Sequence, residues 1–375
     1  MSDRISLRNF SMVIALVLIS AFFAFSQPVF LSARNLSLLS IELSVTAILA
    51  LGMLLVLLPG HIDLSAGSGV GLAGGLAAVL VFDHDWPAPL ALLTAALLAV
   101  GVWAAMGAVI IRQKIPAFII TLGGLLVFKG LHWQVIRNQT IPVVEGGKEN
   151  VYSLLTTYYL PPWAGIGLAV AVFAALVWGT LSARRRRQQF GFVVDDRETL
   201  FLKLFVAGQL GLVLMLVVHQ YRGLPLAAVI LGAVAYGIHV LTQHTPFGRY
   251  LYAVGGNEEA ALISGVPIQR TVIGAFALMG LIVGLTGFMQ TAYSGASTST
   301  VGSLMELDAV AACVIGGTSL RGGRGTVPGV IFGALIMATL LNGLTLMAVS
   351  PEVKYIARGV VLALAVWVDV KLAGK

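Results

Sequence analysis

The feature that most constrains this chain is a series of apolar, almost uncharged runs, each about 18–22 residues long, which is the length that crosses a lipid bilayer as an α-helix. Strands of a membrane barrel would instead alternate polar and apolar residues over about ten positions. Only 10% of the 375 residues are charged, whereas a water-soluble domain carries about 25%. The sequence therefore predicts an all-α, polytopic transmembrane helical bundle that forms one domain over residues 1–375.

Twelve segments have the length and hydropathy of a membrane span. The first is too long for the core of a signal peptide and is interpreted as a retained span. The least apolar is 304–320, because Glu306 and Asp308 lie near one end; a full span and a half-helix or re-entrant segment both fit it. The twelve are 10–30, 41–58, 66–82, 89–111, 115–136, 163–181, 200–219, 224–241, 271–291, 304–320, 326–347 and 355–371.

The distribution of Lys and Arg over the connections predicts the orientation, since cytoplasmic loops carry the excess of basic residues. With the N-terminus in the cytoplasm, sixteen basic residues fall on the cytoplasmic side and six on the other. Leaving out the run Arg184–Arg187 still leaves twelve against six. We therefore expect both termini in the cytoplasm, 137–162 outside and 242–270 inside. This topology also explains the net charge of +7, so no nucleic-acid partner is expected.

Motifs of enzymes and cofactor sites are missing from the sequence. It contains no G-x-x-x-x-G-K-[ST] loop, no His/Cys cluster with zinc-ligand spacing and no nucleophile elbow. The one cysteine, Cys313, lies in an apolar run and is expected to be a packing residue. The chain is therefore expected to be non-catalytic and to bind no cofactor or metal.

The connection 242–270 contains the signals of a short, capped helix. Gly255 and Gly256 permit a tight turn, Asn257 is a good N-cap, and Gly265 is placed to end the helix. A helix of two turns is marginal alone, so either its own bundle or a partner must hold it. The residues assigned to this site are Gly255, Gly256, Asn257, Glu258, Glu259, Ala260, Ala261 and Gly265.

A second stretch, GHIDLSAGS at 60–68, lies between two expected spans. Asp63 or Ser65 can cap the following helix, whose glycines would allow close packing. Alternatively, the carboxylate lines a water-filled path. Asn342 lies inside a span and is interpreted first as a helix–helix contact. The candidates for a translocation path are Asp63, Ser65, Ser68 and Asn342.

Four stretches resemble motifs of one family, the permease subunits of bacterial ABC-type monosaccharide importers of the ribose, xylose and galactose class. They are GRYLYAVGGNEEAALISGV at 248–266, GHIDLSAGS at 60–68, PAFIITLGG at 116–124 and GGTSLRGGRG at 316–325. The resemblance covers about 40–180 and 224–370. Commoner members have ten spans, so this chain is expected to carry an extra helical pair at about 180–223, as the longer xylose-type permeases do.

The resemblance implies a multi-pass protein of the bacterial inner membrane that forms a homodimer around one path. It also implies a cytoplasmic ABC ATPase subunit, which receives the short helix of 242–270, and a periplasmic sugar-binding protein, which selects a sugar such as xylose. Membrane lipid is the remaining expected partner. The alternative function is an ion-coupled secondary transporter of a small polar solute. That class needs ionisable residues at membrane depth, whereas the ionisable residues here fall near the ends of expected spans.

Overall fold

The computed structural model describes residues 2–144, 147, 149–194 and 196–373. Within them the chain is almost entirely helical, with one two-stranded ribbon of β1 (Ile141–Pro142) and β2 (Ala296–Ser297). The helices are α1 (Ser2–Ser26), α2 (Ala33–Leu57), α3 (Ala66–Phe82), α4 (Ala88–Gln113), α5 (Ala117–Val135), α6 (Val151–Thr157), α7 (Pro162–Gln189), α8 (Arg197–His219), α9 (Leu226–His244), α10 (Pro246–Gly256), α11 (Glu258–Ile263), α12 (Ile268–Ser294), α13 (Met305–Ile315), α14 (Val327–Leu346) and α15 (Pro351–Ala373).

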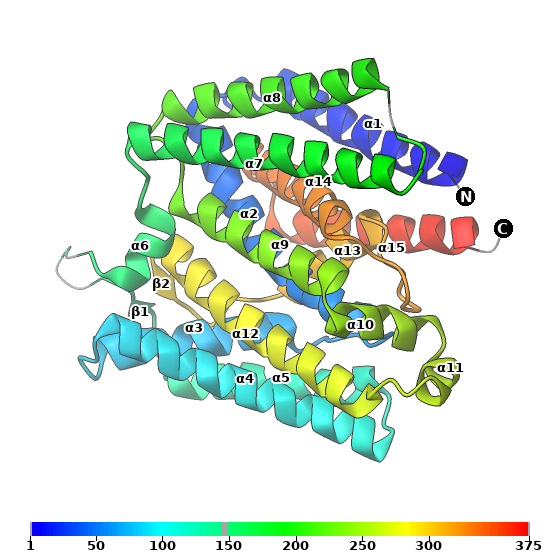
Figure 1. Ribbon diagram of the computed structural model, residues 1–375. Helices are drawn as coiled ribbons and strands as arrows, with labels where there is room; N and C mark the ends of the chain where they lie inside the picture. Colours follow the sequence, from blue (N-terminus) through cyan, green and yellow to red (C-terminus); the bar gives the residue numbers. More distant parts are fainter. Residues whose placement is uncertain (1, 145–146, 148, 195, 374–375) are drawn as a thin grey trace.

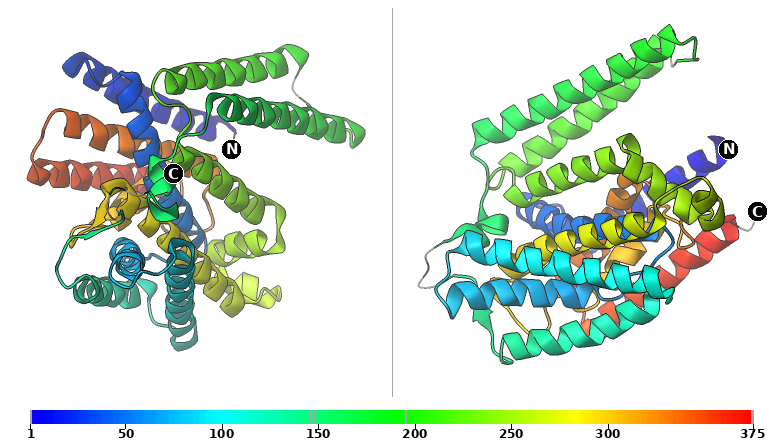
Figure 2. Two further views of the ribbon diagram at one scale, coloured as in Figure 1. Left: turned by 90° about the vertical axis from the view of Figure 1, so that its left-hand side faces the viewer. Right: turned by 60° about the horizontal axis from the view of Figure 1, so that its bottom comes forward.

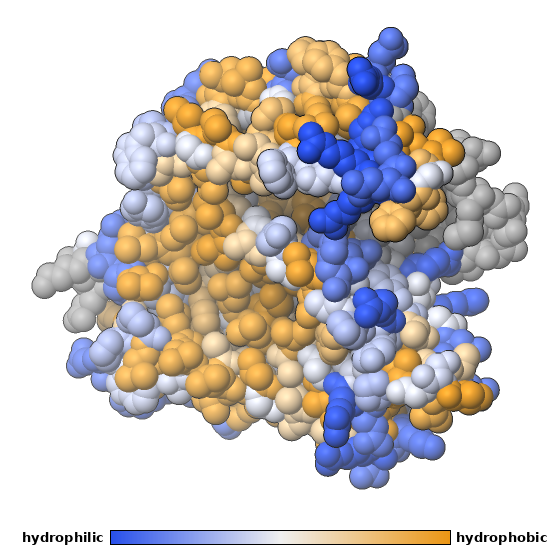
Figure 3. Space-filling model, viewed as in Figure 1, coloured by the Kyte–Doolittle hydropathy of each residue, from blue (hydrophilic) through white to orange (hydrophobic). Residues whose placement is uncertain are grey.

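The expected all-α, polytopic membrane bundle is confirmed. Each of the twelve expected segments coincides with a helix. Eight helices in the described part of the chain have both the length and the hydropathy of a membrane span: α2, α4, α5, α7, α8, α9, α12 and α14. The outward faces of α4, α5, α7 and α8 carry many large apolar side chains, and Figure 3 shows a broad hydrophobic band across the molecule.

The long helices run between two opposite ends of the molecule (Figure 1). One end, here called the α6 end, carries α6 and the β1–β2 ribbon. The other, here called the α11 end, carries α10 and α11 together with the start of α1 and the end of α15. The two ends of the chain therefore lie on the same side of the bundle, as an even number of crossings requires.

Helix α2 is the centre of the bundle. Residues 47–58 are buried throughout, because α9, α12, α13 and α14 all pack around this helix. A helix that is apolar on every side needs such enclosure. Helix α12 also packs on α3 and α4, so α2 and α12 together hold most of the core.

Glycines allow α3 and α12 to cross in backbone contact. A Cβ atom on Gly287 would lie 2.5 Å from the carbonyl oxygen of Val70, and one on Gly74 would lie 2.5 Å from the carbonyl oxygen of Gly287. Small residues at such crossings let helices approach closely in lipid. The close packing expected for the glycines after 60–68 is therefore present.

Helix α13 is a half-helix, which decides between the two expectations for 304–320. Its 11 residues rise about 16 Å, roughly half of the ~30 Å hydrocarbon core. The irregular segment 298–304 leads from β2 into the bundle, and Leu304 starts the helix with a left-handed φ of 62°. Segment 298–304 and α13 thus complete the crossing together.

Helices α7 and α8 form a hairpin at the edge of the bundle, and only 6% of the apolar span of each is buried. Figure 2 shows both helices diverging from the remaining bundle toward the α11 end. At the α6 end their connections are tied to the bundle, where the backbone N–H of Leu160 donates to the carbonyl of Leu224 at 2.9 Å. This hairpin overlaps the stretch 180–223, where the added helical pair was expected, but α7 begins well before that stretch, at Pro162.

Two connections contain elements that the sequence did not predict. The connection 137–162 contains α6 and β1, where only a loop was expected. Helix α10 occupies the first half of 242–270, where one short helix was expected. These three elements are short and lie beside the bundle ends, so their stability depends on packing that local patterns do not reveal.

Candidate functional site

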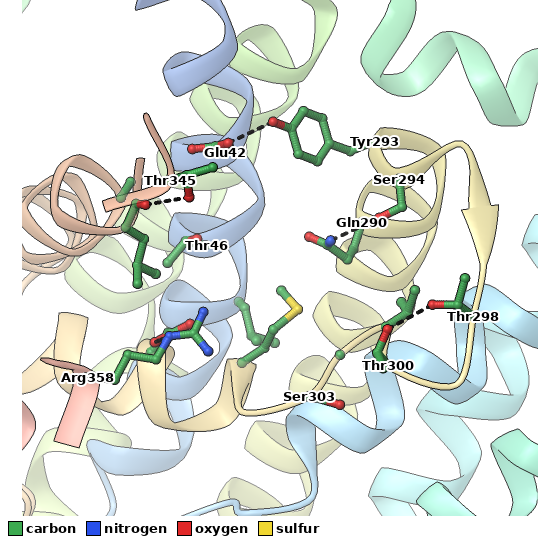
Figure 4. A pocket seen from close by; sticks show the side chains of 17 residues that line it. Glu42, Thr46, Gln290, Tyr293, Ser294, Thr298, Thr300, Ser303, Thr345 and Arg358 are labelled. Carbon is green, nitrogen blue, oxygen red and sulfur yellow. Dashed lines mark hydrogen bonds and ion pairs between the residues drawn. The ribbon is translucent and has the colours of Figure 1, made fainter. Parts of the chain in front are cut away.

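A polar cavity of about 320 Å³ lies between α2, α12, α14, α15 and the segment that leads into α13 (Figure 4). It sits beside the middle of α2, since Glu42, Thr46 and Leu49 form one wall. This cavity, called the polar cavity below, is lined mainly by groups that exchange hydrogen bonds with hydroxyls. Its polar lining residues are Glu42, Thr46, Gln290, Tyr293, Ser294, Thr298, Thr300, Ser303, Asp308, Thr345 and Arg358.

The Glu42 carboxylate is held on the cavity wall by donors from two other helices. The Tyr293 hydroxyl of α12 donates to its Oε1 at 2.8 Å, and Nδ2 of Asn342 on α14 donates to its Oε2 at 3.2 Å. Asn35 Nδ2 in turn donates to Asn342 Oδ1 at 2.9 Å. A carboxylate fixed in this way is a positioned hydrogen-bond acceptor.

An ion pair forms another part of the wall. Arg358 Nε of α15 lies 3.2 Å from Asp308 Oδ1 in the first turn of α13. Ionisable side chains inside a membrane bundle normally pair with each other or face a polar cavity, and this pair does both. It also joins the half-helix to α15.

A second cavity, of about 450 Å³, lies on the other side of the segment 299–303. Residues 300–303 line both cavities, so this segment is the wall between them. Lys129 and His132 of α5, Glu306 of α13 and Tyr355 of α15 line the second cavity. Because α13 starts inside the bundle, Glu306 and Asp308 lie deeper than the end of a full span would.

None of the four path candidates lines the polar cavity. Asp63 is fully buried; its Oδ1 accepts from the backbone N–H of Ser65 at 2.8 Å and from the Ser65 hydroxyl. Its Oδ2 accepts from Trp103 Nε1 at 2.6 Å. Ser68 lines the second cavity. Asn342 stands behind Glu42. Asp63 and Ser65 thus join the start of α3 to α4, while Ser68 and Asn342 are close to the two cavities.

The capped helix expected in 242–270 is α11. Asn257 is its N-cap, with Oδ1 accepting from the backbone N–H of Ala260 at 2.9 Å. Gly265 follows the helix with a left-handed φ of +79°. Both features match the prediction. The tight turn expected at Gly255 and Gly256 is wrong, because these residues are the last two of α10.

Gly255 is needed for a close approach. A Cβ atom there would overlap the carbonyl oxygen of Leu58 and lie 2.5 Å from the backbone nitrogen of Gly323. The backbone N–H of Gly323 itself donates to that same Leu58 carbonyl at 2.9 Å. A Cβ on Gly322 would lie 2.9 Å from both the Cα of Gly255 and the backbone nitrogen of Gly60. We call this meeting point of Gly60, Gly255, Gly322 and Gly323 the glycine junction.

The glycine junction brings together three connections that are far apart in the sequence. They are the α2–α3 connection, the α10–α11 boundary and the α13–α14 connection. The last contains the GGRG turn, in which the backbone N–H of Gly322 donates to the Ser319 carbonyl at 3.1 Å. The end of α10 therefore contacts the connections that precede α3 and α14.

Helix α11 presents apolar side chains to the surroundings of the bundle. Leu262 is 64% exposed and Ile263 is 88% exposed, whereas Ala261 is buried. The carboxylate of Glu258 influences the nearby His61: burial lowers the pKa of that imidazole, and Glu258 opposes the shift. The exposed surface of α11 thus combines an acidic first turn with an apolar tip.

Residues 35–366 match the protein family described as the permease component of branched-chain amino acid transport systems. The chain belongs to this permease family. It is 37% identical to the xylose transport system permease protein XylH of Escherichia coli K12, over 97% of this chain and 92% of that protein. It is 38% identical to XylH of Haemophilus influenzae, over 97% and 96% of the two chains. The ribose import permease protein RbsC of Escherichia coli K12 is 32% identical, over 96% and 92%. No solved structure matches this permease. The family resemblance of the four motifs is confirmed.

The sequence did not lead to most residues of the polar cavity. Glu42 was the strongest available signal, since it is an acidic residue at the start of an otherwise apolar run. Tyr293 and Arg358 gave no comparable signal, because each lies near the end of an apolar run, where such residues are common. Only the packing of α2, α12 and α15 brings them to one cavity.

Proposed function

We propose that this permease is the membrane subunit of an ATP-driven importer for a monosaccharide, with xylose as the first candidate. The observation that carries the proposal is the similarity to xylose transport permeases over almost the whole chain. The polar cavity supports it, because its hydroxyl, amide and carboxylate groups suit a solute rich in hydroxyls. This permease catalyses no covalent step and needs no cofactor; ATP hydrolysis belongs to a separate subunit.

The sugar passes along the face that carries the two cavities, and a second permease copy covers this face. Lys129 and Tyr355 are exposed at the second cavity, and Glu306 lies beneath them. Ionisable groups facing lipid at this depth would be costly, whereas a homodimer would enclose them around a hydrated path. Of the sequence candidates, Ser68 and Asn342 are closest to this path. Asp63 and Ser65 support it from the start of α3.

The cytoplasmic ATPase docks on α10 and α11. The exposed tip at Leu262 and Ile263 supplies an apolar contact, and the acidic first turn supplies charge. The glycine junction then links α11 to the α13–α14 connection, so the ATPase acts on the wall of the polar cavity. For ATP to drive the cycle, the ATPase must bind the two permease conformations with different affinities.

The remaining assignments concern the orientation of this permease, its location and its other partners. The α11 end, with both termini, faces the cytoplasm of a bacterial cell, and this permease lies in the inner membrane. The periplasmic sugar-binding protein docks at the α6 end, on α6 and the β1–β2 ribbon. The helical pair added to the ten-span family core is the α7–α8 hairpin, which is peripheral to the path. No nucleic acid takes part.

Transport assays distinguish this proposal from ion-coupled secondary transport. This permease is reconstituted into vesicles with its ATPase and binding protein, and uptake of labelled xylose and ribose is measured. Uptake should require ATP and should continue when an uncoupler removes the ion gradients. Loss of uptake on uncoupling, with ATP held constant, would favour the ion-coupled alternative.

The docking surface has its own test. Replacing Leu262 and Ile263 together by Ser should reduce the amount of ATPase that copurifies, while the amount of folded permease stays the same. Val193→Ser is the control, because Val193 is 94% exposed in the α7–α8 connection at the same end of the molecule. Equal ATPase recovery from both variants would exclude α11 as the docking element.

A further inference from the structure

A groove separates the α7–α8 hairpin from the bundle near the α11 end. Helices α7 and α9 diverge there in both views of Figure 2, and the space between them has a volume of about 490 Å³. Figure 3 shows this part of the surface as hollowed, with hydrophilic residues gathered at the α11 end. We call it the α7–α9 groove. Its lining residues are Trp178, Gly179, Ser182, Ala183, Arg186 and His244.

One face of α7 forms most of the groove. Gly179, Ser182, Ala183 and Arg186 are spaced i, i+3, i+4 and i+7, so their side chains lie along a single stripe. His244, the last residue of α9, faces them across the groove. Gly179 leaves the groove open, since a Cβ atom there would meet no heavy atom within 4 Å.

The groove is polar at one end and apolar beyond it. The Arg186 guanidinium, the His244 imidazole and the Ser182 hydroxyl lie toward the α11 end. Farther along α7, the same stripe continues with Val172 and Leu176, both exposed. This order of groups fits an amphiphile with a hydrogen-bonding, anionic head and a hydrocarbon tail.

We propose that the α7–α9 groove binds an anionic phospholipid, with the phosphate on Arg186 and His244 and an acyl chain along α7. A guanidinium presents its N–H donors in a fork that matches phosphate oxygens. The neighbouring space between α7 and α8, about 380 Å³, is lined by Arg184 and Arg187 and extends the positive field. Basic residues at the end of an apolar helix attract anionic lipids in this way.

The positive charge of the arginines near the end of α7 favours a lipid with a net negative headgroup over a zwitterionic lipid. Four consecutive arginines lie near the end of α7, and a headgroup whose own cation offsets its phosphate charge would be attracted to them less than a net negative one. With the proposed cytoplasmic orientation of the α11 end, this lipid would belong to the cytoplasmic leaflet of the membrane. Binding in detergent does not depend on that orientation. The lipid site can therefore be disproved without affecting the proposed orientation, and the orientation can be disproved without affecting the site.

Native mass spectrometry of the full-length permease in detergent tests the proposal, with phosphatidylglycerol and phosphatidylcholine as probes. We expect this permease to retain phosphatidylglycerol several-fold better than phosphatidylcholine. Gly179→Leu, which fills the groove, and Arg186→Gln with His244→Gln, which removes the guanidinium and the imidazole, should each abolish the difference. Gly167→Leu is the matched control, because a Cβ there also meets open space on α7. Arg112→Gln removes an exposed arginine from the end of α4 and should leave the preference intact.

Each other result contradicts the proposal. Equal retention of the two lipids excludes a charge-selective site, and equal loss in Gly179→Leu and Gly167→Leu excludes this groove. If Gly179→Leu instead converts a dimer to a monomer in light scattering, the groove holds a second copy of the chain. Size-exclusion profiles confirm folding, and the Arg186→Gln with His244→Gln variant decides if Gly179→Leu does not fold.

Discussion

The two adjacent glycines at the end of α10, Gly255 and Gly256, differ in how closely other parts of the chain approach them. A Cβ at Gly255 would overlap the backbone of Leu58, whereas one at Gly256 would meet nothing within 4 Å. We expect Gly255→Ala to lower the free energy of unfolding by about 1–3 kcal/mol, the usual cost of overpacking, and to reduce sugar uptake. Gly256→Ala should leave both unchanged. Thermal unfolding in detergent and vesicle uptake measure the two effects. Equal stability of the two variants would mean that the three connections separate readily.

Asp63 gives a second prediction at this scale, because both of its oxygens accept hydrogen bonds in a fully buried place. In Asp63→Asn the amide group must face a donor, and in Trp103→Phe one carboxylate oxygen loses its partner. Each change should destabilise this permease by about 1–3 kcal/mol. The control is Asp83→Asn, at an exposed position after α3. If Asp63→Asn abolishes uptake with unchanged thermal stability, Asp63 contacts the solute and the support role is wrong.

At the scale of elements, α11 depends on its cap. Asn257→Ala removes an N-cap worth about 1 kcal/mol, and Gly265→Val places a β-branched residue at a φ of +79°. Because α11 is short and exposed, both variants should be made in near-normal amounts but should copurify with less ATPase. Replacing Glu258 and Glu259 by Lys should act in the same direction, through the helix dipole.

Ser264→Ala is the control for these variants. Its hydroxyl donates to the carbonyl of Ala260 at 2.8 Å, at the end of α11 opposite the cap. Copurification and uptake should stay close to those of the unaltered protein. If the cap variants also behave normally, α11 is an ordinary connection between α10 and α12.

The sequence predicted α11 well because the residues that start and end this helix act only on their near neighbours in the chain. The side chain of Asn257 reaches only three residues ahead, and the backbone conformation of Gly265 belongs to one residue. The role of Gly255 was misread for the opposite reason: its neighbours, Leu58 and Gly323, are distant in sequence. Helix α13 was recognised as unusual from Glu306 and Asp308, but its ion pair with Arg358 could not be read from spacing. Apolar runs were sufficient to predict the spans. The residues of the polar cavity could not be predicted, because they come together only when the spans pack.

For the whole molecule, the orientation is the main prediction that labelling can test. A cysteine at Val144, in the connection before α6, should react with a membrane-impermeant maleimide added from outside. A cysteine at Gln188, near the end of α7, should react only after the membrane is opened. The native Cys313 is fully buried and should give no background. The reverse pattern of labelling would place the α11 end outside the cell.

The segment 299–303 has a consequence for how a solute can move. It separates two chambers, and its residues 300–303 belong to the lining of both. If this segment moves toward one cavity, that cavity becomes smaller and the other becomes larger. Because α13 continues directly from this partition and the connection after it contains Gly322 and Gly323 of the glycine junction, a movement driven from the α11 end in the proposed importer would change the sizes of the two chambers. A solute bound in one chamber would therefore oppose that movement, and its release would allow α13 to change position.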